Sequence, residues 1–466
     1  MNKKFKVLLI SNDINQETIS ELAAPIGLCY LAGYAEKHFP GQFEFVIKSN
    51  LDFPWQKEAD LVGFSSMSRY FPQAVRLARE LKKTHKGPMI LGGSHITCLP
   101  QTLPPEFDLG VIGEGEETFR ELLEVFVSHR DFPAGELAKI RGIVRHSEGK
   151  AVVNPPRPLI ENLDQIPLPR RDLWDIAGQN VVWVSSSRGC PFNCVFCAVA
   201  RTRHREFSAE YVAEELLYLK KTYNPKAISF HDDLFMMNQE RLVEIISQLR
   251  KKGFKRDTGF GLSLRANFIT PESVKLMKEL NVITVFIGIE SGCERGLNYL
   301  KGGNLKLEEV TRALKLLKEN QIMVEGSFII GNPQETRQDL LDTYNFIVDH
   351  YKAGELTFIL TNLMTPYPGS RIWDYALQRG LVSPEMDFSR LNMALHSFDP
   401  YNCIYLNENI PLTEFVDYVD IFEDLHFSVN RPRYQLLKES FPDTFEKRRL
   451  DRERLRRFKD ENSAAG

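Results

Sequence analysis

The chain has 466 residues, of which 43% are hydrophobic, and its formal net charge at pH 7 is −3. This length predicts about three domains, and the small net charge excludes a strong electrostatic attraction to nucleic acid or to an anionic membrane. No apolar run approaches the ~20 residues that a membrane-spanning helix needs, and the start, MNKKFKVLLIS, lacks the longer apolar core of a secretory signal. We therefore expect a cytoplasmic protein with no membrane span.

The first 150 residues alternate between strand-like and helix-like segments. Short apolar segments predict strands at residues 4–11, 43–49, 59–66, 88–93 and 109–115. Helical patterns lie between or after most of them, as at residues 25–38, 71–85 and 116–129. This alternation predicts a parallel sheet with crossover helices, and ligands of such sheets bind beyond the carboxyl ends of the strands.

Small and flexible residues stand at three of these strand ends. The candidate ligand contacts are Ser65, Ser66 and Met67, then Gly92 and Gly93, then Gly113, Glu114 and Gly115. A glycine at such a point lets a ligand approach the backbone closely. The alternative for each glycine is a tight turn without a ligand. His95 follows the glycine pair and not the first strand, so we interpret it as a turn residue rather than a metal ligand.

Residues 1–150 resemble the cobalamin-binding domain, which has a flavodoxin-like, Rossmann-type fold. Ser65 and Met67 stand where that family often shows Ser-x-Leu, and Gly92-Gly93 matches its Gly-Gly turn. The best-known members also carry Asp-x-His-x-x-Gly after the first strand, but this chain has SNDINQET there, and Asp424-Leu425-His426 lies elsewhere and lacks the glycine. The resemblance implies cobalamin without a histidine from that motif below the cobalt. A domain that keeps the fold and has lost the ligand is the alternative.

A linker and a second α/β domain follow. Residues 155–174 contain five prolines, which break helices and central strands, so we interpret residues 151–179 as an interdomain linker. From residue 180 to 385, six strand–helix units predict a partial (β/α)6 barrel of the TIM type. In barrels of this kind the chemistry lies at the carboxyl ends of the strands.

Three cysteines lie just past the first barrel strand, within "RGCPFNCVFCAVA". The other four of the seven cysteines, Cys29, Cys98, Cys293 and Cys403, are scattered, which is typical of small buried residues and not of a disulfide framework. Structural zinc needs four ligands, and the nearest candidate, His204, has a spacing that fits no common zinc finger. A disulfide leaves one thiol over. A cubane iron–sulfur cluster normally takes four thiolates, so three leave one iron with an open coordination site.

The spacing Cys190-x-x-x-Cys194-x-x-Cys197 is the signature of the radical S-adenosylmethionine (radical SAM) enzymes, which residues 180–385 resemble. The resemblance implies a 4Fe–4S cluster held by these cysteines, with S-adenosylmethionine chelated to the open iron. Reductive cleavage would give a 5′-deoxyadenosyl radical that abstracts hydrogen from the substrate. The protein would supply orientation and exclusion of water.

The same resemblance assigns roles to residues at the other strand ends. Phe196 corresponds to an aromatic that flanks the adenine, and Asp232 or Asp233 to a carboxylate that accepts from the ammonium group. Arg265, with Ser263, is placed to meet the ligand carboxylate. Glu290 resembles a ribose-contacting acid, and Gly331 begins a turn under the adenine. The alternative for each is a local role: the aspartates capping a turn, or Arg265 paired with Glu290.

The last segment, residues 386–466, predicts a small helical region. The mixed charges of residues 444–461 are typical of a solvated helix, and we expect the tail 461–466 to be disordered. Only Cys403 lies in this region, which gives no basis for a second cluster.

Together these resemblances imply a cobalamin-dependent radical SAM methyltransferase acting on an unactivated carbon or phosphorus of a metabolite or lipid intermediate. One S-adenosylmethionine would remethylate the cobalt, and a second would generate the radical. An electron donor such as flavodoxin or ferredoxin is implied, and no nucleic-acid partner is expected. Three alternatives remain: cyclisation, ring contraction or carbon–carbon coupling without methyl transfer; an empty first domain that serves as a lid; and a non-catalytic iron–sulfur scaffold.

Overall fold

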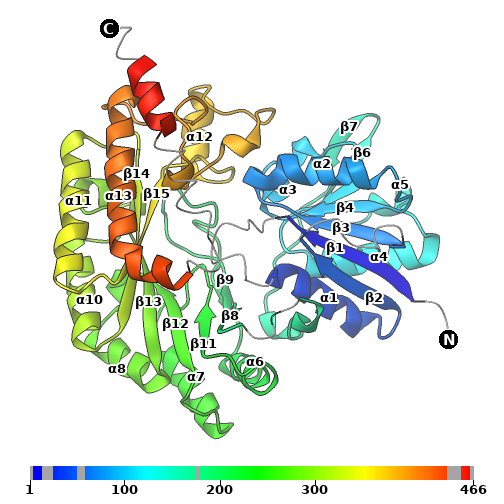
Figure 1. The fold of residues 1–466 in the computed structure, drawn as a ribbon. Coiled ribbons are helices and arrows are strands. Elements are labelled where there is room, and N and C mark those ends of the chain that lie inside the picture. The colour runs from blue at the N-terminus through cyan, green and yellow to red at the C-terminus, as the bar shows by residue number, and fades with distance from the viewer. Residues whose placement is uncertain are drawn as a thin grey trace. The chain divides into compact units, whose positions relative to one another are not determined.

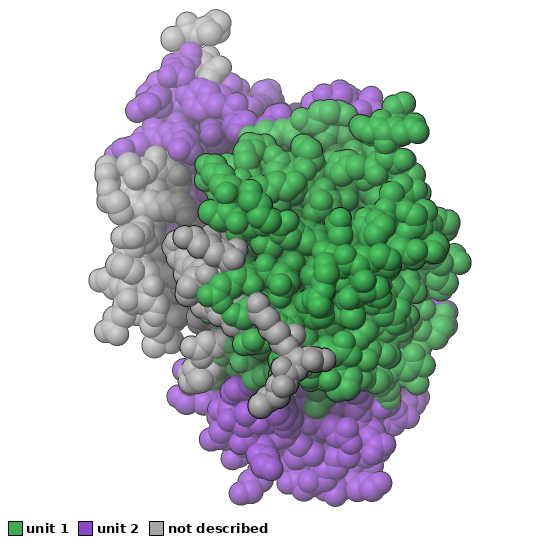
Figure 2. Space-filling model, turned by 90° about the vertical axis from the view of Figure 1, so that its right-hand side faces the viewer, with its two compact units in different colours: residues 1–179, 383–389 green, residues 180–382, 390–466 purple. Residues whose placement is uncertain are grey.

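The computed structural model describes residues 4–12, 25–49, 58–174, 176, 179–437 and 453–461. The chain divides into two compact units, residues 1–179 with 383–389, and residues 180–382 with 390–466. Figure 2 colours the two units separately. The first break falls where we expect the barrel to begin, and the Pro-rich residues before it belong to unit 1. The described helices include none that is long and apolar enough to cross a membrane.

Unit 1 is built on a twisted seven-stranded sheet with the strand order β2-β1-β3-β4-β5-β6-β7. Its strands are β1 (Phe5–Ser11), β2 (Phe43–Lys48), β3 (Leu61–Ser65), β4 (Met89–Gly92), β5 (Leu109–Val111), β6 (Ile143–Ser147) and β7 (Lys150–Val153). Strands β1 to β5 are parallel, and their order, 2-1-3-4-5, is that of the flavodoxin-like fold. The predicted fold of this domain is confirmed.

Helices cover both faces of this sheet (Figure 1). They are α1 (Ile26–His38), α2 (Phe71–Leu81), α3 (Ser94–Cys98), α4 (Glu116–His129) and α5 (Ala134–Leu137). Alternate residues of β1, such as Phe5, Val7 and Leu9, join apolar side chains of α1 and α4 in one buried cluster. This two-sided burial explains why the strands are continuous apolar runs.

The sequence pattern did not predict the hairpin of β6 and β7, which adds two antiparallel strands at the sheet edge. Glu148 and Gly149 form its turn with φ of 51° and 77°. Two successive positive φ values are typical of the tight turns that match the twist of a hairpin. Glu-Gly is a weaker sequence signal for that turn than Asn-Gly or Asp-Gly, which is why the hairpin escaped detection.

Unit 2 contains six parallel strands in sequential order, which confirms the predicted partial barrel. The strands are β8 (Val181–Val184), β11 (Ala227–Phe230), β12 (Gly259–Leu264), β13 (Val282–Glu290), β14 (Met323–Ile330) and β15 (Phe358–Leu363). The helices are α6 (Ala209–Thr222), α7 (Glu240–Lys251), α8 (Pro271–Leu280), α9 (Glu294–Lys301), α10 (Leu307–Glu319), α11 (Arg337–Lys352) and α12 (Arg371–Gln378). Figure 1 shows α7, α8, α10 and α11 on the outer side of the curled sheet.

The carboxyl-terminal region of unit 2 is helical, as predicted. Helix α13 (Leu412–Leu437) lies beside β15 (Figure 1). The Asn430 side chain exchanges hydrogen bonds with the backbone of Ile359, accepting from its N–H at 3.1 Å and donating to its carbonyl at 2.8 Å. Residues 453–461 form a further helix, in which Leu455 and Phe458 are buried. The tail 462–466, and residues 444–452 of the charged run, lie outside the described residues.

Candidate active site

The three clustered cysteines lie on a loop that backbone and side-chain hydrogen bonds hold at several points. Two short antiparallel strands, β9 (Ser187–Arg188) and β10 (Arg205–Glu206), bracket this loop. Across it, the Cys190 N–H donates to Thr202 Oγ1 at 2.9 Å, and the Thr202 N–H donates back to the Cys190 carbonyl at 3.0 Å. The loop is therefore a fixed frame for its thiols.

The thiols of this loop lie within electrostatic reach of one another. Burial is the main cause that raises the pKa of Cys190, and it raises the pKa of Cys197 to about 11, with the neighbouring thiols and Asp233 contributing in the same direction. Thiols must lose their protons to bind metal, so metal binding would relieve this mutual unfavourable interaction.

His204 does not complete a zinc site with these cysteines. Its Nδ1 lies 3.0 Å from the Gly189 carbonyl, and its Nε2 lies 3.0 Å from Glu206 Oε1. Within the described ranges, no group of three His, Cys, Asp or Glu side chains is arranged to hold a single metal ion. The donor set is three sulfurs, which fits a 4Fe–4S cluster with one open iron.

Arg265 lies against the cysteine loop from the end of β12. Its guanidinium lies 3.8 Å from the centre of the Phe192 ring, and its Nη1 lies 3.8 Å from Cys194 Sγ. The same group donates to the Asn304 carbonyl at 3.1 Å. Arg265 is buried. It lies against the cysteine loop and does not pair with Glu290. Ser263, two residues earlier, donates to the Phe230 carbonyl at 3.3 Å.

The two aspartates after β11 occupy different environments. Asp232 is buried, and its carboxylate accepts from the backbone N–H of Ser186 at 2.7 Å and from the hydroxyls of Ser186 and Ser187 at 3.0 and 2.8 Å. Burial raises its pKa to about 6. Asp233 is exposed and accepts from the Gly189 N–H at 3.0 Å, beside Cys190. Of the two, Asp233 is the one with carboxylate capacity left for a ligand.

Phe196 and Glu290 are brought together through Lys301, a residue that sequence reasoning missed. Lys301 Nζ lies 5.6 Å from the Phe196 ring centre and donates to Glu290 Oε1 at 2.9 Å. Both side chains of this ion pair are 6% exposed. Glu290 also accepts from Ser327 Oγ at 3.3 Å. The backbone of Glu290 has φ of 68°, which is uncommon for a residue with a side chain and is typical of functional sites.

Gly331 begins the turn after β14, with φ of 85°. Its N–H donates to Glu335 Oε2 at 2.6 Å, and Asn332 Nδ2 donates to Glu335 Oε1 at 3.3 Å. Burial raises the pKa of Glu335 to about 8. Asn407 donates from Nδ2 to the carbonyls of Asn332 and Glu335 at 2.7 and 2.8 Å. These bonds fix the shape of the turn, while no hydrogen bond between described residues joins Gly331 itself to the cysteine loop.

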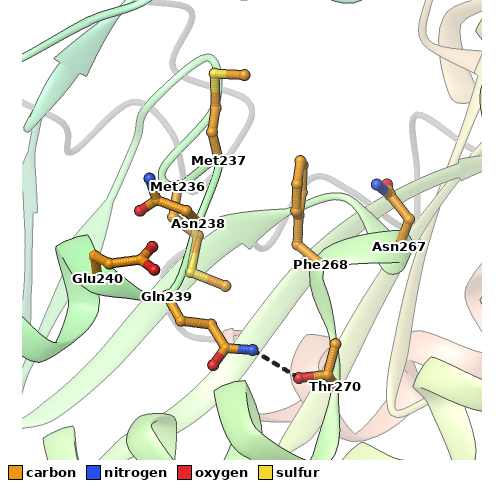
Figure 3. Close-up of a pocket in the computed structure, with 8 residues that line it drawn as sticks. All are labelled: Met236, Met237, Asn238, Gln239, Glu240, Asn267, Phe268 and Thr270. Carbon is orange, nitrogen blue, oxygen red and sulfur yellow. Dashed lines mark hydrogen bonds between the residues drawn. The ribbon is translucent and has the colours of Figure 1, made fainter.

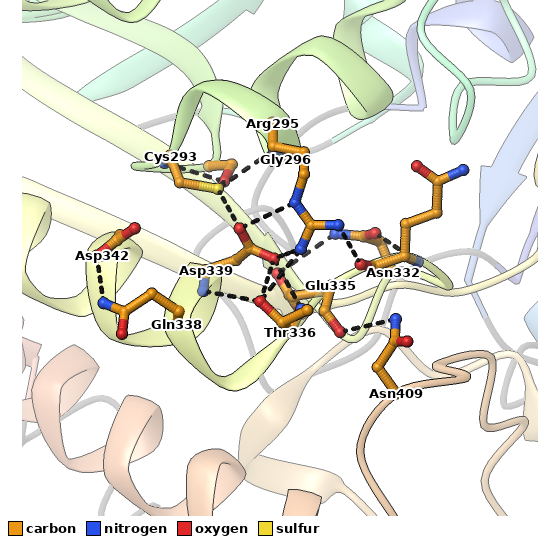
Figure 4. Close-up of polar contacts among 12 residues, drawn as sticks. Cys293, Arg295, Gly296, Asn332, Glu335, Thr336, Gln338, Asp339, Asp342 and Asn409 are labelled. Carbon is orange, nitrogen blue, oxygen red and sulfur yellow. Dashed lines mark hydrogen bonds and ion pairs between the residues drawn. The ribbon is translucent and has the colours of Figure 1, made fainter.

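A polar network ties the start of α11 to the start of α9 behind this turn (Figure 4). Asp339 accepts from the Thr336 N–H at 2.7 Å and forms an ion pair with Arg295. Arg295 also donates to the Gln334 carbonyl at 2.9 Å. Cys293 caps α9, accepting from the Gly296 N–H at 3.2 Å. The network connects the strand ends of β13 and β14 and explains the role of one scattered cysteine.

A cavity of about 280 Å³ opens between the loops that follow β11 and β12 (Figure 3). Its lining includes Met236, Met237, Gln239 and Phe268. Gln239 donates to Thr270 Oγ1 at 3.0 Å across one side. The Phe268 ring lies 6.0 Å from the ring of Phe192 on the cysteine loop, so this cavity adjoins the candidate site.

In unit 1, the first two predicted strand ends come together. The Ser66 N–H donates to the Gly92 carbonyl at 3.1 Å. Gly93 has φ of 98°, and a Cβ there would lie 2.6 Å from the backbone nitrogen and oxygen of Ser66. Ser66 is buried, whereas Met67 is 43% exposed. Ser65 is the last residue of β3, so all these residues lie at the carboxyl edge of the sheet, as predicted.

The third predicted strand end follows β5. The Gly113 N–H donates to Thr97 Oγ1 at 3.0 Å, and the space where a Cβ of Gly113 would lie is open. Glu114 accepts from the Ile160 N–H at 3.1 Å, and Gly115 directly precedes α4. At the end of β1, Asn12 Oδ1 is buried without a hydrogen-bond partner in the described part of the chain. Open backbone and a buried acceptor at this edge fit a polar ligand such as cobalamin.

His95, interpreted from the sequence as a turn residue rather than a metal ligand, lies in the short helix α3 directly after the Gly93 turn and is buried. Its Nδ1 lies 3.1 Å from Ser68 Oγ and its Nε2 lies 3.0 Å from Thr102 Oγ1. The imidazole stacks on Phe71 at 3.7 Å between ring centres and meets Phe388, from segment 383–389, at 4.6 Å. Burial lowers its pKa to about 3. Because both ring nitrogens have hydroxyl neighbours, His95 has no nitrogen left for a metal.

Comparison with known proteins identifies both parts of the chain. Residues 184–347 match the radical SAM superfamily, and residues 14–123 match the B12 binding domain. The chain is 33% identical over 401 residues, 82% of its length, to the uncharacterized methyltransferase PH0819 of Pyrococcus horikoshii, and the match covers 85% of that protein. The chain belongs to the radical SAM enzymes that carry a cobalamin-binding domain. Its cofactors are therefore S-adenosylmethionine, a 4Fe–4S cluster and cobalamin.

Two further similar proteins are informative. The chain is 27% identical to an anaerobic magnesium-protoporphyrin IX monomethyl ester cyclase of Rubrivivax gelatinosus. That match covers 70% of this chain and 62% of the cyclase. The radical S-adenosylmethionine methyltransferase TsrM of Kitasatospora setae, solved with cobalamin and an iron–sulfur cluster bound, superposes with a TM-score of 0.64 at 19% identity. That match covers 87% of this chain and 83% of TsrM, and it supports the same fold over both units.

Proposed function

We propose that this enzyme transfers a methyl group to an unactivated carbon or phosphorus of a metabolite or lipid intermediate by radical chemistry. The observation that carries the proposal is the cysteine loop, where three thiols lie close together, one of them 3.8 Å from the buried Arg265, and where no described side chain completes a site for a single metal ion. When bound, the cluster supplies the electron that cleaves S-adenosylmethionine, and cobalamin supplies the methyl group. The similarity to PH0819, a protein named as a methyltransferase, favours methyl transfer.

The chain's own residues perform binding, orientation and charge compensation. Cys190, Cys194 and Cys197 would hold the cluster. Arg265 is a fixed cation close to Cys194 and is placed to bind a carboxylate or to offset the negative charge of thiolates. The exposed carboxylate of Asp233, beside Cys190 on the cysteine loop, is available to a cationic group of the ligand.

Lys301 and Phe196 form the other wall of this proposed site. The buried Lys301–Glu290 pair holds a cation under the Phe196 ring, and removing one member of such a pair leaves an uncompensated buried charge. We propose that Phe196 flanks an adenine and that the pair fixes the ring. The proposed cobalamin contacts are the strand ends Ser65 to Met67, Gly92 and Gly93, and Gly113 to Gly115.

The test is product analysis with the anaerobically reconstituted, full-length enzyme. We expect both 5′-deoxyadenosine and S-adenosylhomocysteine, because the two uses of S-adenosylmethionine leave different products. Formation of 5′-deoxyadenosine without S-adenosylhomocysteine would contradict methyl transfer. Cys197→Ala is expected to abolish S-adenosylmethionine cleavage. The control is Cys403→Ala, because Cys403 lies outside the cysteine loop and its pKa is raised to about 12 by burial. Cleavage by Cys197→Ala at the normal rate would contradict the radical mechanism.

Radical cyclisation without methyl transfer is the second candidate, and the similarity to the Rubrivivax gelatinosus cyclase favours it. This chemistry would use the same cysteine loop and the same S-adenosylmethionine contacts. It predicts that S-adenosylhomocysteine stays absent while 5′-deoxyadenosine forms in a fixed ratio to product. The product ratio therefore separates the two candidates.

A further inference from the structure

A second cavity, of about 290 Å³, lies directly behind the cysteine loop and has no role in the chemistry described above. Its lining consists of Val195, Tyr299, Pro333, Gln334, Arg371, Ile372, Tyr375, Arg379 and Glu408. Val195 lies between Cys194 and Cys197 in the sequence, so part of the cavity wall belongs to the proposed cluster loop itself. A group bound in the cavity would contact Val195, which directly follows Cys194 in the sequence.

The loop is rigidly attached at this point. The Val195 N–H donates to the Leu300 carbonyl at 3.0 Å, and the Val195 carbonyl accepts from the Ile372 N–H at 3.0 Å. Asn193 packs against Gly302, where a Cβ would lie 2.8 Å from the Asn193 carbonyl oxygen. The cavity is thus a fixed feature between the ends of α9 and α12.

The uncompensated charges beside this cavity are positive. Asn193 Oδ1 accepts from Arg201 Nε at 2.7 Å and from Arg371 Nη1 at 3.3 Å. Both arginines are exposed, and neither forms an ion pair with a described residue. The only acid of the lining, Glu408, is taken by Arg379 at 2.8 Å and also accepts from Tyr375. Arg379 in turn lies 3.7 Å from the Tyr375 ring centre.

Reduction of the cluster needs an electron from outside the chain. The remaining cysteines, Cys29, Cys98, Cys293 and Cys403, are scattered in the sequence, and no group of three His, Cys, Asp or Glu side chains in the described part of the chain is arranged to hold a further metal ion. Electron transfer is fast only over short distances, so the donor has to reach the surface next to the cysteine loop. Transient electron-transfer complexes have small interfaces and are guided by opposite charges.

We propose that Arg371 and Arg201, with the cavity behind Val195, form the docking surface for a small acidic one-electron carrier protein. A carboxylate of the carrier would pair with Arg371 at the cavity, and one electron would pass from the reduced carrier to the oxidised cluster without bond formation. This inference rests on the proposed function, since it presumes a cluster on the cysteine loop.

The experiment measures binding of oxidised, isotope-labelled flavodoxin to the reconstituted full-length enzyme by NMR titration, at low and at high salt. Arg371→Glu is expected to weaken binding about tenfold at low salt and to reduce its salt dependence. Arg371 is the first residue of α12, where an acidic side chain is favoured by the helix dipole, so this variant should fold. Arg201→Glu, on the other side of Asn193, should act in the same direction.

Arg256→Glu is the matched control. Arg256 is also exposed, but it lies before β12, at the opposite edge of the sheet, where it donates to the Lys278 carbonyl at 3.1 Å. Equal binding by Arg371→Glu and Arg256→Glu would overturn the proposal. Binding of inorganic phosphate at Arg371 without binding of flavodoxin would also overturn it and assign the cavity to a small anion. Dithionite-driven formation of 5′-deoxyadenosine reports on the proposed function separately, because dithionite needs no docking surface.

Discussion

Each unit contains a glycine turn at the carboxyl end of a parallel strand, and similar contacts stabilise the two turns. Gly93 follows β4 in unit 1, and Gly331 follows β14 in unit 2, with φ of 98° and 85°. Each is followed within four residues by a buried titratable side chain, His95 or Glu335. Each turn also meets an aromatic ring from a much later segment, Phe388 against His95 and Phe415 against Gly331.

The difference between the turns lies in the chemistry of the buried group. The His95 imidazole is held between hydroxyls and aromatic rings, and burial depresses its pKa. The Glu335 carboxyl accepts from the turn backbone, and burial raises its pKa. Both groups are thereby kept neutral, but an acid and a base reach neutrality from opposite sides. The two units should therefore lose stability at opposite ends of the pH range.

Glu335 gives the largest expected effect. Its pKa is about 8 in the folded protein against 4.5 for the ordinary group, so between these values the folded state retains a proton that the unfolded state has lost. The stability contribution is complete below pH 4.5 and is lost as the pH rises through 8, at about 1.4 kcal/mol per pH unit. Glu335→Gln should remove this slope. Denaturant unfolding at a series of pH values, from roughly 5 to 8, measures this slope. The prediction is refuted if the free energy of unfolding depends on pH in the same way in Glu335→Gln and in the unchanged protein.

His95 should give the mirror image in unit 1. Its pKa is about 3 when folded against an ordinary 6.5, so in this window the unfolded state binds a proton that the folded state excludes. The stability contribution is present above pH 6.5 and is lost as the pH falls toward 3, with a slope of about 1.4 kcal/mol per pH unit. His95→Asn should flatten the acid limb of the unfolding profile. An unchanged acid limb would show that another group controls it.

The two glycines are expected to differ in their tolerance of a methyl group. Gly93→Ala places a Cβ against the rigid backbone of Ser66, and we expect a loss of roughly 3 kcal/mol or more from strain and overpacking. Gly331→Ala meets the end of the Phe415 ring at 3.0 Å, which can shift, so about 2 kcal/mol is expected. Calorimetric unfolding of both variants gives the order. A larger loss for Gly331→Ala would contradict the assigned contacts.

The smallest expected effect concerns the amide that holds the Gly331 turn. Asn407→Ala removes the two hydrogen bonds of 2.7 and 2.8 Å that Nδ2 donates to buried carbonyls and the two that Oδ1 accepts from the N–H groups of Asn409 and Ile410 at 2.9 and 2.8 Å. Their joint loss should cost about 1–2 kcal/mol. Asn409→Ala is the control, because its bonds to neighbouring carbonyls are 3.4 Å long and their loss should be nearly neutral. Unit 1 has a comparable amide in Asn154, whose Nδ2 donates to the carbonyls of Leu137 and Ile140, both at 2.7 Å, but it holds a different turn and not the turn at Gly93.

The sequence predicted both turns because glycine, strand pattern and cysteine spacing are local signals. It also placed Arg265 near the cysteine loop by its position at a strand end. It did not find Lys301, because a lysine in the last turn of a helix is usually solvated, and only tertiary packing buries it against Glu290. Glu335, Asn407 and Phe388 were missed for the same reason. Each contacts its partner through tertiary structure, and neither a helical nor a strand periodicity in the sequence indicates that contact. The individual ligand contacts remain predictions.

Because unit 1 includes the segment 383–389, it consists of two separate stretches of the chain and cannot be isolated by cutting the chain at one point. After the barrel strands are complete, the chain contributes Phe388 to the ring stack of Phe71 and His95. A fragment that ends at residue 179 would lack the edge of that stack and expose its aromatic faces. Exchange of this domain among related enzymes, in the laboratory or in evolution, therefore has to carry two separate pieces of the gene.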